Sequence, residues 1–154
     1  MKVQTVGLAA FGPINPHTAT AAEATAAFGE PSAAAAEDGA FCTRRWAELG
    51  LTIEFATETG DDPCADDARI LEARVGGRAA QGQGWRTAEG IRPGMPVGAA
   101  RRFYPQARRN RDRELVLVPL LRERRSEGAG PVLAVTTASG RVEEMVFPIA
   151  TGSR

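Results

Sequence analysis

Apolar and polar residues alternate in several short segments of this chain. The clearest segment is 51–57, in which Leu51, Ile53 and Phe55 are separated by polar residues. A period of two indicates a β-strand that buries one face and exposes the other. Less regular forms of the pattern predict further strands at 41–48, 69–75, 114–121, 131–137 and 141–149.

The strand predicted at 69–75 has apolar residues in both phases of the alternation. The period of two sets Leu71, Ala73 and Val75 on one face. We therefore expect Ile70 to lie on the opposite face of this strand.

Two segments favour helices. Residues 18–28 are rich in alanine, threonine can cap their start, and Gly29 follows their end. Residues 95–104 form a second short helical pattern, which Pro105 stops. We interpret the polar and alanine-rich segment 32–39 as a loop.

The two halves of the chain repeat this order of elements. Residues 19–29 align with residues 95–105 at an offset of 76 residues, and a glycine-rich hinge at 76–84 separates the halves. We therefore predict an α+β protein of two tandem units, 1–80 and 81–154. Each unit is expected to pack one short helix on an antiparallel sheet of three or four strands.

Charge is divided unevenly between these halves. The chain has 154 residues, 43% of them hydrophobic, and a formal net charge of zero, which is typical of a globular protein. Residues 1–77 hold 5 basic and 12 acidic side chains, whereas residues 78–154 hold 14 basic and 7 acidic ones. One consequence that we consider is self-association through the opposite-charge halves.

Arginine supplies almost all of the basic charge, which suits a GC-rich bacterial coding sequence, and nine arginines lie between positions 101 and 125. The guanidinium fork fits phosphate and carboxylate groups, so an alternative function is arginine-mediated binding of an anionic polymer or nucleic acid. Interleaved acidic residues and the lack of a known motif argue against nucleic acid. The candidate anion-binding residues are Arg101, Arg102, Arg108, Arg109, Arg111 and Arg113.

The chain contains two cysteines, Cys42 and Cys64, which are 22 residues apart. A bond between them would stabilise the fold by roughly 3 kcal/mol in the chain-entropy model. An even number of cysteines in a small domain favours this bond over two reduced thiols. A disulfide would indicate a secreted or cell-envelope protein whose signal peptide has been removed, whereas free thiols would indicate the cytoplasm.

Candidates for chemistry are few. His17 is the only histidine, and the sequence places no nucleophile or carboxylate next to it, so we interpret it as a loop or capping residue. The acidic segment 61–67 lacks the spacing of a calcium-binding loop and is interpreted as solvated. No apolar segment approaches the roughly 18 residues of a membrane span. We therefore predict no metal, no cofactor, no membrane span and no enzymatic activity.

The loop 90–95 contains Gly-Met, and the helix after it ends in the Phe-Tyr-Pro of 103–105; the counterparts in the first half are 12–14 and 28–31. This arrangement resembles the β-lactamase inhibitor protein family and the related small outer-membrane lipoproteins of the SmpA/OmlA type. The stretch 42–46 is also similar to uncharacterised secreted actinobacterial proteins. The resemblance implies an extracytoplasmic, non-catalytic protein that binds other proteins through its sheets. Because the first half lacks Gly-Met, β-lactamase inhibition does not follow from it.

We therefore expect a protein-binding module whose partner is an unidentified protein. The exposed sheet residues that we name for this role are Arg44, Trp46, Glu54 and Arg74. Tryptophan is more often a core residue, so a structural role is the alternative interpretation for Trp46, and we expect Trp85 to seal the junction between the two units.

The cysteine hypothesis predicts the outcome of one mass measurement. Protein purified without reductant is alkylated under denaturing, non-reducing conditions, and its intact mass is determined. We expect no added alkyl groups, because Cys42 and Cys64 are bonded to each other. Two added groups would show free thiols and would argue against export from the cytoplasm.

Overall fold

The computed structural model describes most of the chain, and it contains both helices and strands. The described residues are 4–6, 12–37, 39–57, 62–87, 89–111, 113–118 and 133–149. The elements are β1 (Gln4–Val6), α1 (Ala21–Phe28), β2 (Ala33–Glu37), β3 (Phe41–Trp46), the 3-10 helix η1 (Ala47–Leu49), β4 (Leu51–Ala56), β5 (Arg69–Gly76), α2 (Gly77–Gln83), β6 (Trp85–Thr87), α3 (Val97–Phe103), β7 (Arg108–Arg109), β8 (Leu115–Val118), β9 (Leu133–Ala138) and β10 (Arg141–Pro148). The α+β class is confirmed.

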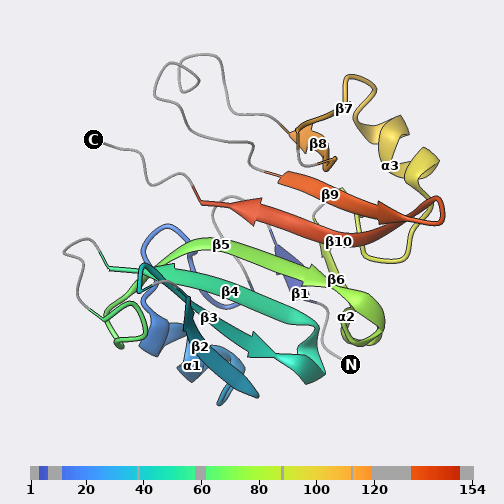
Figure 1. Cartoon of the computed structure of the whole chain (residues 1–154). Helices are drawn as coiled ribbons and strands as arrows, with labels where there is room; N and C mark the ends of the chain where they lie inside the picture. The colour runs from blue at the N-terminus through green and yellow to red at the C-terminus, as the bar shows by residue number, and fades with distance from the viewer. Residues whose placement is uncertain are drawn as a thin grey trace.

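Within the described residues, eight strands form one sheet in the order β2-β3-β4-β5-β10-β9-β8-β7 (Figure 1). All neighbours in this sheet are antiparallel. The strands β1 and β6 form a separate parallel pair. The two sheets predicted for the two halves are therefore one continuous sheet, which is joined where β5 pairs with β10.

The two halves nevertheless contribute matching sets of elements. The first half supplies α1 and then β2 to β5, and the second half supplies α3 and then β7 to β10. The residue before each helix makes an isolated bridge to the first residue of its own half's last strand. These bridges are Thr20 with Arg69 and Pro96 with Arg141.

Local chemistry fixes the start and end of α1. The Thr20 hydroxyl accepts a hydrogen bond from the Glu23 backbone N–H at 3.2 Å, and the Glu23 carboxylate accepts one from the Thr20 backbone N–H at 3.1 Å. This capping box confirms that threonine caps the helix. The helix ends at Gly29, whose φ of 90° suits glycine best.

Two segments predicted as irregular are regular instead. The alanine-rich loop predicted at 32–39 contains β2, because pairing with β3 overrides the weak strand preference of alanine. The hinge predicted at 76–84 contains α2, which buries Ala80 completely. Burial of this side chain offsets the low helix propensity of the surrounding glycines.

The prediction for the faces of β5 is wrong at Ile70. This side chain is 1% exposed and shares the buried face with Ala73 and Val75, whereas Leu71 is only half-buried. The register between β4 and β5 shifts between Glu54 and Phe55. A bulge adds one residue to a strand, so it reverses the side on which the preceding residues point.

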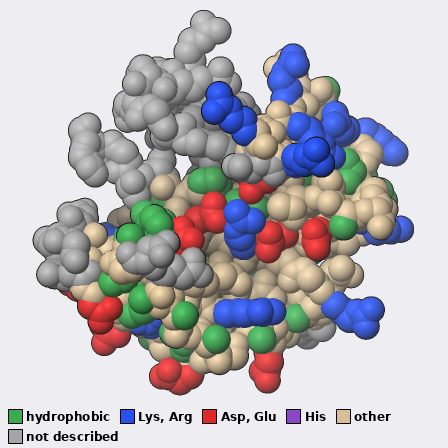
Figure 2. Space-filling view, in the orientation of Figure 1, with side chains coloured by type: hydrophobic (Ala, Val, Ile, Leu, Met, Phe, Trp, Pro, Cys, Tyr) green, Lys and Arg blue, Asp and Glu red, His purple; other side chains and the backbone are tan. Residues whose placement is uncertain are grey.

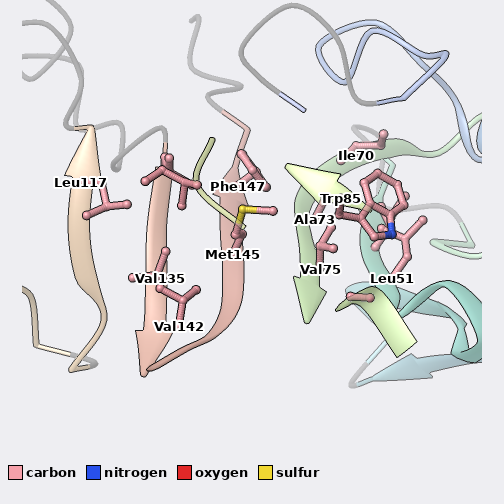
Figure 3. Packing of buried hydrophobic residues seen from close by; sticks show 14 of the residues in the cluster. Leu51, Ile70, Ala73, Val75, Trp85, Leu117, Val135, Val142, Met145 and Phe147 are labelled. Atoms are coloured by element: carbon pink, nitrogen blue, oxygen red, sulfur yellow. The ribbon is translucent and has the colours of Figure 1, made fainter. Parts of the chain in front are cut away.

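The core is a single cluster that contains residues from both halves. Figure 3 shows Leu117, Val135, Met145 and Val75 on neighbouring strands of one layer. The buried alanines of α1, α2 and α3 all belong to this cluster, so the three described helices pack on the same face of the sheet. Trp85 is buried in it and donates a hydrogen bond from Nε1 to the Leu49 carbonyl at 2.8 Å.

The surroundings of Gly50 show how closely α2 packs against η1 and β5. Its φ is 65°, and a Cβ added there would lie 2.5 Å from the Ala80 nitrogen and 2.6 Å from the Gly76 oxygen. Gly39 has a similar φ of 69°, but a Cβ at Gly39 would meet nothing within 4 Å.

We expect Gly39→Ala to lower the free energy of unfolding by about 1 kcal/mol, which is the cost of the left-handed conformation. Gly50→Ala should lower it by about 3 kcal/mol or more, because displacement of the neighbouring backbone adds to that cost. Urea unfolding followed by circular dichroism measures both effects. Equal effects of the two substitutions would contradict the packing of α2.

Candidate functional site

The face of the sheet opposite the helices carries polar residues of β3, β4 and β5, whereas Val146 of β10 and Ala134 of β9 are completely buried on it. We call it the open face, because none of the described helices packs on it. The strand registers align one row of its residues across the whole sheet. From β2 to β7 this row is Ala33, Arg45, Thr52, Arg74, Val146, Ala134, Val116 and Arg108.

Arg74 lies at the centre of this row and binds three carboxylates. Its Nε is 2.7 Å from Glu72, its Nη1 is 3.0 Å from Glu144, and its Nη2 is 3.4 Å from Glu114. We call these four residues the Arg74 cluster. Figure 2 shows acidic side chains around a basic one over the middle of the sheet.

The contact between Arg74 and Glu114 crosses two intervening strands. Glu114 immediately precedes β8, and β10 and β9 lie between β8 and β5. Three strand spacings of about 4.8 Å separate the two backbones by roughly 14 Å in a flat sheet. The two long side chains therefore have to extend toward each other across β10 and β9 to make this contact.

The charges of the Arg74 cluster do not cancel. Burial by itself lowers the pKa of Arg74, but its hydrogen bonds to Glu72 and Glu144 and their charges outweigh burial and raise that pKa above its ordinary value. Arg74 therefore stays cationic. Glu54 lies opposite Glu72 in the register of β4 and β5. Three carboxylates bind one guanidinium, so the Arg74 cluster carries a surplus of negative charge.

Of the four residues that we named as exposed protein-binding positions, two lie on the open face and two lie on the side of the helices. Glu54 and Arg74 are on the open face, where both are half-buried. Arg44 and Trp46 are 9% and 3% exposed, so the expectation that they are exposed is wrong. On β3 they share their face with Cys42, and this face points toward α1: Trp46 donates from Nε1 to the Gly29 carbonyl at 2.7 Å.

Arg44 connects three parts of the first half. It donates from Nη1 to the Thr25 hydroxyl and from Nη2 to the Cys64 carbonyl, both at 2.9 Å. Its guanidinium carbon lies 5.6 Å from the centre of the Phe55 ring, within the range of a cation–π contact. Arg44 is therefore a structural residue that joins α1, the loop before β5 and the core.

The predicted disulfide between Cys42 and Cys64 is present. It ties the loop before β5 to β3, and the Cα atoms of the two cysteines are 5.0 Å apart. The bond is consistent with an oxidising, extracytoplasmic setting. As for membranes, the described helices include none with the length and apolar character of a membrane span.

The six candidate anion-binding arginines lie on α3, on β7 and in the turn after β7. All six are exposed, and none forms an ion pair with another described residue. Basic side chains accordingly gather over the region of α3 and β7 (Figure 2). The structure thus brings together six arginines that form no ion pair within the part of the chain that it describes.

The other candidates for chemistry that we named from the sequence belong neither to the Arg74 cluster nor to the six arginines. His17 is exposed in the turn before α1, where its backbone N–H donates to the Asn15 side chain at 2.9 Å. Asp62 accepts a hydrogen bond from the Cys64 backbone at 2.9 Å. Among the residues that the structure describes, no group of three or more histidine, cysteine or acidic side chains could hold a metal ion.

Sequence reasoning missed the three glutamates of the Arg74 cluster. The alternation of β5 and β10 could have placed Glu72 and Glu144 on the polar faces of their strands. Glu114 had no such signal, because its place beside Arg74 depends on the order of the strands in the sheet.

Tyr104 makes a second polar contact that the sequence did not indicate. Its hydroxyl donates to the Glu89 carboxylate at 3.1 Å. Burial, and then the charge and hydrogen bond of Glu89, raise the pKa of Tyr104 from 10.0 to about 12.

Because Tyr104 is the only tyrosine, the absorbance of tyrosinate reports its ionisation alone. We expect ionisation near pH 12 in the folded protein and a lower pKa in Glu89→Gln, which keeps the burial. Since the pKa is raised on folding, the phenol's contribution to stability is complete below pH 10 and is lost as the pH rises from 10 to about 12. Ionisation of folded wild-type protein near pH 10, like that of urea-unfolded protein, would contradict the contact.

Comparison with known proteins adds no family to this description. No protein-family model, curated protein or solved structure matches the chain. The resemblance drawn from the sequence therefore stays a prediction. The geometry of the open face and of the arginines is the evidence that bears on function.

Proposed function

We propose that this protein is a non-catalytic binding module that acts outside the cytoplasm and contacts a protein partner through its open face. The observation that carries the proposal is the Arg74 cluster. It places a fixed array of charges at the centre of a sheet face on which none of the described helices packs.

The Arg74 cluster is organised before any partner arrives. Three carboxylates hold the guanidinium, so Arg74 loses little additional freedom when a partner binds. The surplus of carboxylates complements lysine or arginine side chains on the partner, and such complementarity speeds association and selects the partner.

The part of the open face that a partner can reach is narrower than the whole sheet. Val146 of β10 and Ala134 of β9 are completely buried on this face. The surface offered to a partner is therefore the part that β2 to β5 form, together with the half-buried Arg74 cluster at its border.

We further infer that the sheet is built from two tandem units that meet at β5 and β10. The matching element order of the halves supports this, as do the bridges of Thr20 with Arg69 and of Pro96 with Arg141. In this account the open face is a joint product of both units, and neither unit alone carries the Arg74 cluster.

Capture experiments with matched variants test the proposal. The purified protein is immobilised and exposed to a cell-envelope extract, and retained proteins are quantified by mass spectrometry. We expect Glu144→Gln to reduce the specific partner about fivefold, because it removes one charge from the open face. Ala35→Arg should reduce it as well, because this exposed residue lies on the open face of β2.

Two control variants carry the same changes on the other side of the molecule. Glu30→Gln alters an exposed residue just after α1, and Ala34→Arg alters the neighbour of Ala35 that faces the helix side of β2. Neither should change capture. A partner retained equally by all four variants would show that the open face is not the contact surface.

A further inference from the structure

A hollow lies at the end of the sheet that β7 forms. It has a volume of about 560 Å³, is open to solvent, and is lined by the end of α3, the turn after it, β7 and β8. Phe103 and Tyr104 line it from α3, Arg108 and Arg109 from β7, and Val116 from β8. Apolar and cationic groups therefore meet in one concavity.

The apolar part of the hollow includes an exposed aromatic ring. Phe103 is 52% exposed, and Phe41 is the only other large hydrophobic residue of the described chain that is exposed. Burial of such a ring is favourable once a ligand covers it. Aromatic residues beside arginines are also typical of the residues that dominate binding energy in interfaces.

The cationic part of the hollow lacks counter-charges. Arg108 and Arg109 form no ion pair with any other described residue, although Arg109 donates from Nη1 to the Arg113 carbonyl at 2.8 Å. The carboxylate of Glu89 is bound by the hydroxyl of Tyr104. The guanidinium groups of Arg108 and Arg109 can therefore bind carboxylate or phosphate groups without first breaking an ion pair with another described residue.

The shape and composition of the hollow favour a peptide over other anions. Single-stranded nucleic acid is bound by successive aromatic rings on which bases stack, but Phe103 is the one strongly exposed ring here. A membrane surface is flat on this scale and would leave the hollow unfilled. A peptide can insert one apolar side chain and place carboxylates on the arginines, which match them in a two-pronged geometry.

We propose that this hollow binds an acidic peptide segment of a protein partner. An apolar side chain of the segment packs against Phe103 and Val116, and flanking carboxylates bind Arg108 and Arg109. This site does not depend on the Arg74 cluster, which has the opposite charge.

A fluorescent peptide with one leucine between pairs of glutamates tests this proposal by anisotropy, at about 0.1 M salt to limit long-range attraction. We expect saturable binding to the intact protein. A peptide with glutamine for glutamate, or with glycine for leucine, should bind at least fivefold more weakly. An oligothymidylate of about 12 nucleotides and vesicles of phosphatidylglycerol should also bind more weakly than the peptide.

Variants of the protein locate the site. We expect Arg108→Glu to weaken peptide binding about tenfold and Phe103→Ser about fivefold. The controls Arg78→Glu and Phe41→Ser make the same changes at exposed positions on α2 and β3, away from the hollow, and should leave binding unchanged. Thermal unfolding of each variant verifies that it is folded.

Three results would overturn the proposal: no saturation at about 1 mM peptide, tighter binding of the oligothymidylate or the vesicles than of the peptide, or equal losses in the control variants. Glu144→Gln should leave peptide binding unchanged. Failure of this proposal is therefore distinguishable from failure of the proposal for the open face.

Discussion

The antiparallel pairing of β5 with β10 is the contact on which the rest of the structure depends. It joins the last strands of the two halves through five residue pairs, from Glu144 with Gly76 to Pro148 with Glu72. Because of this pairing, the apolar faces of eight strands share one core. The same pairing sets Glu144 beside Arg74, so that the charged centre of the open face lies at the seam. A chain that lost this pairing would lose the shared core and the binding surface together.

The two halves of the chain differ in how their arginines are bound. The first half is acidic, and two of its arginines are held by several groups: Arg44 by Thr25 and the Cys64 carbonyl, and Arg74 by three glutamates. The six arginines of α3, β7 and the turn after β7 have no such ion pairs within the described chain. Opposite charges in the sequence therefore become two regions of opposite charge, the Arg74 cluster at the middle of the sheet and the arginines at its β7 end, which can meet different ligands.

Sequence patterns predicted the elements best where one physical signal dominates. The alternation of 51–57 and the cap at Thr20 are local signals, and both are confirmed. The strand β2 and the helix α2 depend on tertiary contacts, which alanine and glycine do not reveal. A bulge moved Ile70 to the buried face. On β3, the period of two showed which residues share a face but not which face meets the core, so Arg44 and Trp46 were assigned to the wrong side.

The disulfide indicates which face of β3 meets the core. A bonded cysteine needs a partner across the fold, and Cys64 lies in the loop before β5, whose backbone accepts hydrogen bonds from the start of α1. Residues in phase with Cys42 must therefore face α1, and those out of phase must form the open face. The same reasoning explains why Arg44 cannot bind an external protein: its donors already hold the disulfide loop and α1 in place. Removal of Arg44 would therefore change the framework on which the open face is built, and removal of Arg74 would leave three neighbouring carboxylates without their counter-charge.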